Sequence, residues 1–210
     1  MLPPDAFTPV PLGVLEEKCN RKFVQGLEEA NLPSGISENK KENSGVRRTY
    51  SNPALKCTRR YLKLVRRLQG AGLVRFMVKC EERAGVFAVK KKNDEQRLIL
   101  DCRHASCHCT DPPKVHLASG AAFASIEVEP GQQVYLGNVD IKVAFYAMEL
   151  PEKLRKYFGL PHDVRAGDVG ITNLEGVKLL PGTRIVPVFC AIPMGRTHSL
   201  AFCQTVLERP

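Results

Sequence analysis

The sequence lacks any apolar run long enough to cross a membrane. Its longest uncharged stretches, residues 115–126 and 185–195, fall well short of the roughly 20 apolar residues that a membrane helix needs. A secretory signal is also missing, because the N-terminal residues MLPPDAFTPVPLGVLEEK contain no basic segment followed by an apolar one. We therefore expect an intracellular protein that is neither secreted nor bound to a membrane, in a compartment that the sequence does not indicate.

Extremes of composition are absent too. The chain has no tryptophan, but 43% of its 210 residues are hydrophobic and 25% are charged, which is an ordinary globular mixture. Wholesale disorder and fibrous repeats are excluded, and the length allows one domain with a substantial core. Eight cysteines are present, and without a secretory signal we expect reduced thiols rather than a disulfide framework.

What the chain does have is an uneven excess of positive charge. The formal net charge is +9, and residues 40–92 alone carry sixteen lysines and arginines against three glutamates, a local net of +13. A basic segment beside a mildly acidic remainder points to a polyanionic partner, most simply nucleic acid. The alternative, which charge alone leaves open, is a solvated basic face without a partner.

Residues 1–50 are rich in proline, glycine, asparagine, serine and charge, so we expect a disordered or linker-like extension. Residues 13–29 could form a short helix within it, whereas residues 31–48 have the composition of a linker. The first firm element is a helix over residues 52–69, which starts with an Asn52-Pro53 cap. One face of this helix is apolar, and much of the remainder carries the cations Arg59, Arg60, Lys63, Arg66 and Arg67.

Beyond this helix, short strands and helices alternate irregularly, which favours an α+β fold. Residues 85–92 and 97–101 predict a β-hairpin around a polar turn. The other expected elements are helices over 119–126, 151–158 and 197–208, strands over 134–140 and 144–150, and a second hairpin formed by 177–180 and 183–191 around Pro181-Gly182.

Three clusters of residues carry possible chemistry. On the first hairpin, Lys90, Lys91 and Lys92 face Arg97 and could clamp a triphosphate, although a merely soluble basic tip has the same pattern. Asp140 follows an apolar stretch, where a carboxylate can bind a metal ion or simply cap a turn.

The third cluster is Ile192-Pro193-Met194-Gly195, a loop between an apolar run and a helix. Its glycine allows the backbone to approach a ligand closely, and the following helix start can face an anion. An ordinary strand-to-helix loop is the alternative.

Together, and in this order, these clusters resemble reverse transcriptases, and those of long-terminal-repeat retroelements most closely. VKKKNDEQRLILDCRHAS is similar to the fingers hairpin of that family, NVDIKVAFYAMELP to the first catalytic motif of the palm, and IPMGRTHSLAFCQ to the next palm motif. The helix followed by GAGLVRF matches the leader segment. The resemblance covers residues 52–204 and implies a right-hand polymerase fold with fingers-like residues 51–128 and part of a palm in residues 129–210.

The resemblance implies roles for particular residues. Asp140 would be the catalytic carboxylate that binds the first of two Mg²⁺ ions. Arg97 and Lys91, with Lys90 close behind, would hold the triphosphate of an incoming deoxynucleotide. Phe145 would exclude a ribose 2′-hydroxyl, and Met194 with Gly195 would lie against nucleotide and template. The basic helix would contact the phosphates of the template–primer.

One departure from the family pattern is serious. The parent family needs a further Y/F-x-D-D motif for template-directed nucleotidyl transfer, and these 210 residues contain no Asp-Asp pair. Since one carboxylate cannot hold two divalent ions, we expect a retroelement polymerase fragment that is inactive alone. The alternative is a non-catalytic basic module that binds nucleic acid. A structural zinc site at Cys102, Cys107 and Cys109 with His104, His108 and His116 is a lesser possibility.

Overall fold

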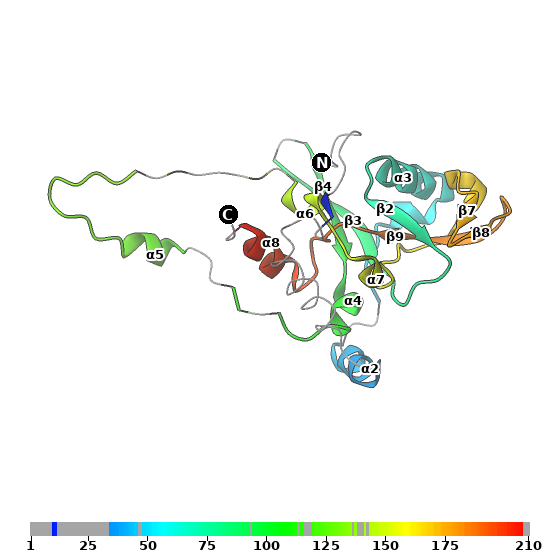
Figure 1. Cartoon of the computed structure of the whole chain (residues 1–210), viewed down its shortest axis with the longest axis horizontal. Helices are drawn as coiled ribbons and strands as arrows, with labels where there is room; N and C mark the ends of the chain where they lie inside the picture. The colour runs from blue at the N-terminus through cyan, green and yellow to red at the C-terminus, as the bar shows by residue number, and fades with distance from the viewer. Residues whose placement is uncertain are drawn as a thin grey trace.

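The computed structural model describes residues 10–11, 34–45, 48–92, 94–112, 114–115, 119–135, 137, 141 and 143–207. Helices and mainly antiparallel strands are mixed along the chain, which confirms the α+β class (Figure 1). The helical elements are α2 Ser34–Asn43, η2 Pro53–Lys56, α3 Thr58–Gly70, α4 Arg103–Cys107, α5 Gly120–Ala124, α6 Ala144–Ala147, α7 Glu152–Arg155, η3 Ala166–Val169 and α8 Ser199–Leu207. The strands are β1 Val10–Pro11, β2 Val74–Met77, β3 Gly85–Lys90, β4 Gln96–Asp101, β5 Met148–Glu149, β6 Val164–Arg165, β7 Asn173–Leu174, β8 Val177–Lys178 and β9 Arg184–Phe189.

Strand β9 is the centre of the largest sheet. It pairs antiparallel with β2 on one side and with β6 on the other. Every β9 residue after Arg184 is buried, as expected for an apolar strand that is covered on both faces. Beyond β9, the N–H of Cys190 donates to Leu73 and the N–H of Ile192 to Met148. The β9 segment therefore connects the β2 region to the β5 region.

Helix α3 follows the predicted amphipathic pattern. Its Tyr61, Val65 and Leu68 are buried in the core, because they recur at helical spacing on one face. The Asn52 cap also forms, since its side chain accepts the N–H of Ala54 at 2.9 Å. The capped element is, however, the short 3-10 helix η2, and α3 itself begins at Thr58.

Strands β3 and β4 form the predicted hairpin. They are antiparallel over six residue pairs, from Gly85–Asp101 to Lys90–Gln96, and the N–H of Lys91 donates to Glu95 across the turn. At the base of the hairpin, a Cβ on Gly85 would overlap the carbonyl of Tyr50. Glycine is therefore needed where the segment before η2 crosses β3.

The segment predicted as linker contains a helix instead. Helix α2 covers Ser34–Asn43, and its two lysines reach other parts of the chain. The Nζ of Lys40 donates to the carbonyl of Cys109 at 3.0 Å and to Asp111 at 2.9 Å, while Lys41 donates to Glu82. The linker prediction was wrong here because these contacts span 41 to 71 positions in the sequence, beyond the reach of local composition.

The strand predicted over residues 144–150 is mostly helical. Val143 takes a left-handed conformation with φ of 53°, a one-turn helix α6 follows, and only Met148–Glu149 form a strand. A short apolar run fits either element, and the core decides by burying Tyr146. In the stretch predicted as strand 134–140, the described residues Val134, Tyr135 and Gly137 are irregular. The remainder of that stretch, and the helix predicted over 13–29, lie outside the described residues.

The second predicted hairpin does not form as expected. A turn does occur, since the N–H of Thr183 donates to Leu180, but its flanking segments do not pair with each other. Strand β8 pairs with β7 around Glu175 and Gly176, which both have positive φ. The reason is that β9 already has β2 and β6 as its two neighbours.

The remaining predicted helices form. Helix α5 is capped by the Ser119 hydroxyl, which accepts the N–H of Ala122, and stands away from the sheets (Figure 1). Helix α7 occupies half of the stretch predicted over 151–158, and α8 occupies most of the stretch predicted over 197–208. Within the part of the chain that the structure describes, no helix combines the length and apolar character of a membrane span.

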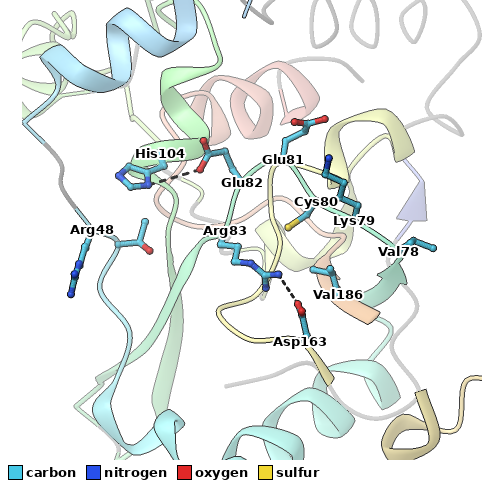
Figure 2. A pocket seen from close by; sticks show the side chains of 11 residues that line it. Arg48, Val78, Lys79, Cys80, Glu81, Glu82, Arg83, His104, Asp163 and Val186 are labelled. Atoms are coloured by element: carbon cyan, nitrogen blue, oxygen red, sulfur yellow. Dashed lines mark hydrogen bonds and ion pairs between the residues drawn. The ribbon is translucent and has the colours of Figure 1, made fainter. Parts of the chain in front are cut away.

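Glu82 is a buried carboxylate that joins three segments. Its Oε1 accepts from Lys41 of α2 and lies 3.0 Å from Nε2 of His108. Its Oε2 lies 3.9 Å from Nδ1 of His104 (Figure 2). Burial raises the pKa of Glu82, but the hydrogen bonds from His108 and Lys41 outweigh it and lower the pKa to about 2. Glu82 therefore stays ionised and holds α2 against α4.

This lowered pKa predicts an acid-dependent loss of stability. A carboxyl group with a folded-state pKa of about 2, below the usual 4.5, contributes stability above about pH 5 that is lost as the pH falls toward 2. We expect Glu82→Gln to be less stable than the natural protein at pH 7, and to lose less stability between pH 5 and pH 3. Urea unfolding midpoints across this range measure both effects. The exposed Glu127→Gln is the control, and an unchanged pH slope in Glu82→Gln would contradict the assignment.

Candidate nucleic-acid and nucleotide site

The tip of the β3–β4 hairpin brings together the residues that the sequence assigned to the triphosphate. Lys90, Lys91 and Arg97, with Lys92 and Glu95, line a pocket of about 510 Å³. The antiparallel register explains this, because Arg97 faces Val89 and so lies beside the lysines that follow it. The pocket is therefore a concentrated cationic surface with one acid.

Two of these cations have partners on the hairpin itself. Lys90 is paired with Asp94 at 2.6 Å and Lys91 with Glu95 at 3.5 Å. The Lys90 pair is exposed and contributes little, since solvent screens it. Arg97 has no ion-pair partner among the described residues, so its fork of donors is available to an anion.

The described residues 143–151 of the motif that resembles the first palm motif pack on β4 through α6. In α6, the hydroxyl of Tyr146 donates to the carbonyl of Leu98 at 2.9 Å, and burial raises the pKa of Tyr146 to about 12. The neighbouring Phe145 is half-buried and packs against the core. The motif is thus fixed one residue along β4 from Arg97.

The loop formed by residues 192–195 also packs on β4. Gly195 has φ of +106°, and a Cβ at this position would lie 2.6 Å from the carbonyl oxygen of Leu100. The hydroxyl of Ser199 donates to Pro193 at 2.7 Å and closes the loop onto the start of α8. Met194, half-buried, lies between these two anchors.

Asp140, the predicted metal-binding carboxylate, lies outside the described residues, and so does His116 of the possible zinc cluster. In the described ranges, no group of three or more His, Cys, Asp or Glu residues is arranged to hold a metal ion. Cys102, Cys107 and Cys109 are buried, whereas His104 and His108 turn toward Glu82.

The basic face of α3 divides into two parts. All five cations are exposed, but only Arg60 and Arg67 line a groove of about 580 Å³ between α3 and the hairpin, where Phe87 and Leu98 contribute apolar surface. Arg66 points to the opposite side, where its Nε donates to the carbonyl of Asp168 at 2.7 Å. The structure therefore places Arg60 and Arg67 beside the hairpin and uses Arg66 to hold η3. Arg59 and Lys63 complete the exposed set.

Comparison with known proteins adds evidence on the fold. Neither a protein-family model nor a curated protein matches the sequence. The solved structure of a foamy viral protease–reverse transcriptase in complex with double-stranded DNA is similar, with a TM-score of 0.50 at 13% identity. The fold is reverse-transcriptase-like. The match covers 92% of this chain but only 32% of the viral one, so the chain spans about a third of the length of that protein.

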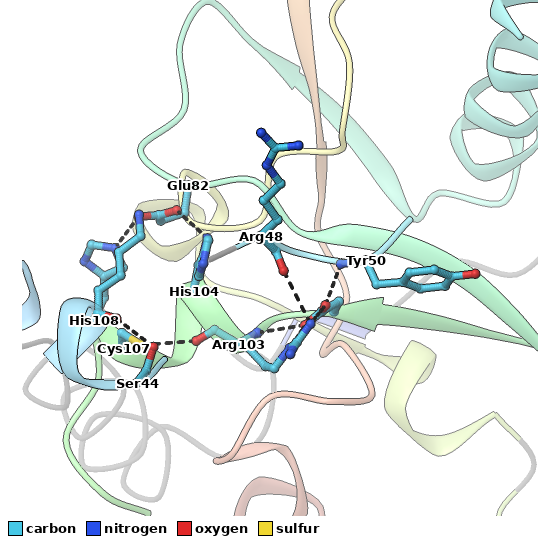
Figure 3. A network of polar contacts seen from close by, with 10 residues as sticks. Ser44, Arg48, Tyr50, Glu82, Arg103, His104, Cys107 and His108 are labelled. Carbon is cyan, nitrogen blue, oxygen red and sulfur yellow. Dashed lines mark hydrogen bonds and ion pairs between the residues drawn. The ribbon is translucent and has the colours of Figure 1, made fainter. Parts of the chain in front are cut away.

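Sequence reasoning missed how the end of β4 is held in this reverse-transcriptase-like fold. The buried Asp101 accepts from Nε of Arg103 at 2.8 Å, from Nη2 of the same side chain at 2.6 Å and from the N–H of Tyr50 at 2.7 Å (Figure 3). Burial raises the pKa of Asp101, but these hydrogen bonds outweigh it and lower the pKa.

Arg196 was also missed, and no local signal marks it. Its side chain is buried, with the guanidinium 5.5 Å from the ring centres of both Phe158 and Phe202. Nη2 donates to the sulfur of Cys109 at 3.2 Å, while Nε and Nη1 have no hydrogen-bond partner in the described part of the chain. This caged cation fixes the chain one residue after Gly195.

The close approach of Gly195 to β4 predicts that an alanine at this position lowers the free energy of unfolding. Gly195→Ala combines an unfavourable φ with overlap against the Leu100 carbonyl, so we expect a loss of about 2 kcal/mol or more in the free energy of unfolding. Gly182→Ala is the matched control, because a Cβ there meets nothing within 4 Å. Urea unfolding of both variants measures the difference, and equal stability would contradict this placement of the loop.

Proposed function

We propose that this chain forms the fingers and part of the palm of a retroelement-type reverse transcriptase, and that it binds a template–primer and an incoming deoxynucleoside triphosphate. One observation carries the proposal. The hairpin cations, the palm-like motif and the glycine loop, which are far apart in sequence, all meet on strand β4 through Arg97, Leu98 and Leu100. The reverse-transcriptase-like fold supports the same function.

In this proposal, Arg97 and Lys91 hold the triphosphate, and Lys90 assists from the same pocket. Arginine offers a two-pronged donor to phosphate oxygens, and lysine offers a point charge. Phe145 screens the sugar 2′ position and so favours deoxynucleotides. Met194 and Gly195 lie against the nucleotide and the template.

The nucleic acid lies along α3. Arg60 and Arg67 face the groove beside the hairpin, and Arg59 with Lys63 extends the exposed cationic surface. Such side chains contact phosphates, which gives affinity without base specificity. Arg66 contributes less in this arrangement, because it already donates to Asp168.

The residues of this chain do not fit the pair of Mg²⁺ ions that nucleotidyl transfer requires. Asp140 is the one carboxylate that the family resemblance assigns to a metal, these 210 residues contain no Asp-Asp pair, and the described residues form no metal-binding group. We therefore derive no catalytic step for this chain and propose that it binds substrates without turnover.

The proposal predicts nucleotide binding without synthesis. We expect no extension of a primed template by the purified chain with Mg²⁺ and deoxynucleotides, but measurable binding of a fluorescent deoxynucleoside triphosphate by polarisation. Lys91→Gln with Arg97→Gln removes two charge-assisted contacts and should weaken this binding at least tenfold. The exposed Lys178→Gln should leave it unchanged.

Either of two results would overturn this assignment. Primer extension by the chain alone would show that the metal site is complete. Equal nucleotide affinity in the double variant and in the natural protein would show that the hairpin is only a soluble basic tip.

The basic helix predicts a salt-dependent affinity for template–primer. Each phosphate contact contributes about 0.9 to the slope of log affinity against log salt, so Arg60→Gln with Arg67→Gln should reduce the slope by about 1.8. Lys114→Gln with Lys178→Gln removes two exposed charges elsewhere and should leave the slope unchanged. Fluorescence anisotropy between 50 and 200 mM salt measures it. An unaltered slope in the helix variant would exclude α3 from the interface.

A second candidate function is supported by the local net charge of +13 in residues 40–92 and by the missing Asp-Asp pair. A non-catalytic module would bind nucleic acid through α3 but would not bind a free deoxynucleotide. The polarisation measurement therefore separates the two functions.

A further inference from the structure

A second polar pocket lies at the other end of the β3–β4 hairpin from the cationic tip formed by Lys90, Lys91 and Arg97. It has a volume of about 670 Å³, and it is bounded by residues 78–83 after β2, by Arg48 and Thr49, by His104 of α4 and by Asp163 before β6 (Figure 2). Strand β3 runs five residue steps from Gly85 to Lys90, or about 17 Å. The pocket is therefore separate from the tip that binds the triphosphate in the proposed function.

The acids of this pocket are already neutralised by partners. Glu82 accepts from Lys41 and is hydrogen-bonded to His108, neither of which lines the pocket. Asp163 is paired with Arg83 at 2.5 Å, and Glu81 lies 3.8 Å from Nζ of Lys156. An anion that enters the pocket therefore meets little uncompensated negative charge.

Two cations of the pocket, in contrast, have no side-chain partner among the described residues. The side chains of Arg48 and Lys79 are exposed and form no hydrogen bond or ion pair with any described residue. Arg83 adds a fixed guanidinium, because its Nη1 donates to the carbonyl of Leu160 at 2.8 Å and its Nη2 to Asp163. Lys41 and Lys156, which do not line the pocket, pair with Glu82 and Glu81, and Arg83 pairs with Asp163, so the uncompensated charge of the pocket is that of Arg48 and Lys79.

Cys80 forms part of the wall between Lys79 and Glu81. Burial raises the pKa of this half-buried thiol, so it is neutral at pH 7 and does not repel an anion. Its position also makes it a reporter, since a ligand in the pocket blocks access to the sulfur.

We propose that this pocket binds a phosphate group, with Arg48 and Lys79 as the binding cations and Arg83 as a further, fixed donor. Arginine and lysine are the side chains that match phosphate, as a fork and as a point charge respectively. The volume is in the range of small-ligand sites, so the phosphate can be free, as in pyrophosphate, or part of a nucleic-acid backbone. This site is independent of the nucleotide-binding function proposed for the hairpin tip.

The test is protection of Cys80 from alkylation at pH 8.5 without Mg²⁺, at constant ionic strength, with peptide mass spectrometry as the readout. We expect pyrophosphate to slow the labelling of Cys80 about tenfold at a concentration roughly ten times its dissociation constant. Cys57, exposed at the start of α3, reports any general effect of the anion in the same sample. No protection of Cys80 up to 20 mM pyrophosphate would overturn the proposal.

Two charge-reversal variants test whether Arg48 and Lys79 are the binding cations. Arg48→Glu with Lys79→Glu should abolish the protection, whereas Lys178→Glu, an exposed charge reversal on β8, should retain it. Both altered residues in the pocket are exposed, so folding should be preserved, and circular dichroism checks this. Retained protection in the double variant would overturn the assignment.

A single-stranded oligonucleotide distinguishes the two sources of phosphate. Protection by the oligonucleotide at lower phosphate concentration than by pyrophosphate supports a backbone site, and protection by pyrophosphate alone supports a site for a free anion. Nucleic acid bound at α3 is expected to slow labelling of Cys57 instead. Absence of nucleic-acid binding at α3 therefore appears at Cys57, failure of the proposed nucleotide binding appears in the polarisation measurement, and failure of this inference appears at Cys80.

Discussion

The free edge of strand β4 is the constraint on which the candidate site depends. In an antiparallel pair, carbonyls two residues apart point to the same side. The Leu98 carbonyl accepts from Tyr146, so the Leu100 carbonyl faces the same way and meets Gly195. A strand edge that would otherwise expose unpaired groups is covered by helix α6 and by the Gly195 loop, both from later in the chain. The hairpin, helix α6 and the glycine loop thereby meet along β4.

Sequence patterns within a single element were sufficient to predict the α3 region and the β3–β4 hairpin. The Asn52-Pro53 cap and the spacing of Tyr61, Val65 and Leu68 predicted the helical region, and the polar turn after the lysines predicted the first hairpin. Helix α6 could not be predicted, because its apolar residues fit a strand equally well until Tyr146 finds its partner on β4. The pairing of β8 likewise depends on distant strands, because β2 and β6 occupy both edges of β9.

The residues of the candidate site also fall into two groups, those that the sequence could bring together and those that it could not. Lys90, Lys91 and Arg97 could be grouped from the sequence, because the register of one hairpin brings them together. The contact of Lys41 with Glu82 and the burial of Arg196 depend on segments that are distant along the chain, and no spacing rule predicts them. The motifs that resemble those of reverse transcriptases were recognisable by their order in the sequence, while the contacts that hold them in place appear only in the folded chain.

The cage around Arg196 has a mechanical consequence for the loop that precedes it. The guanidinium is held between the ring of Phe158, next to α7, and that of Phe202, in α8. Any swing of Met194 and Gly195 would pull a cation out from between two rings and uncover apolar surface on both. The loop is therefore stiff for a reason unrelated to ligands, and its resting geometry is determined by the protein interior.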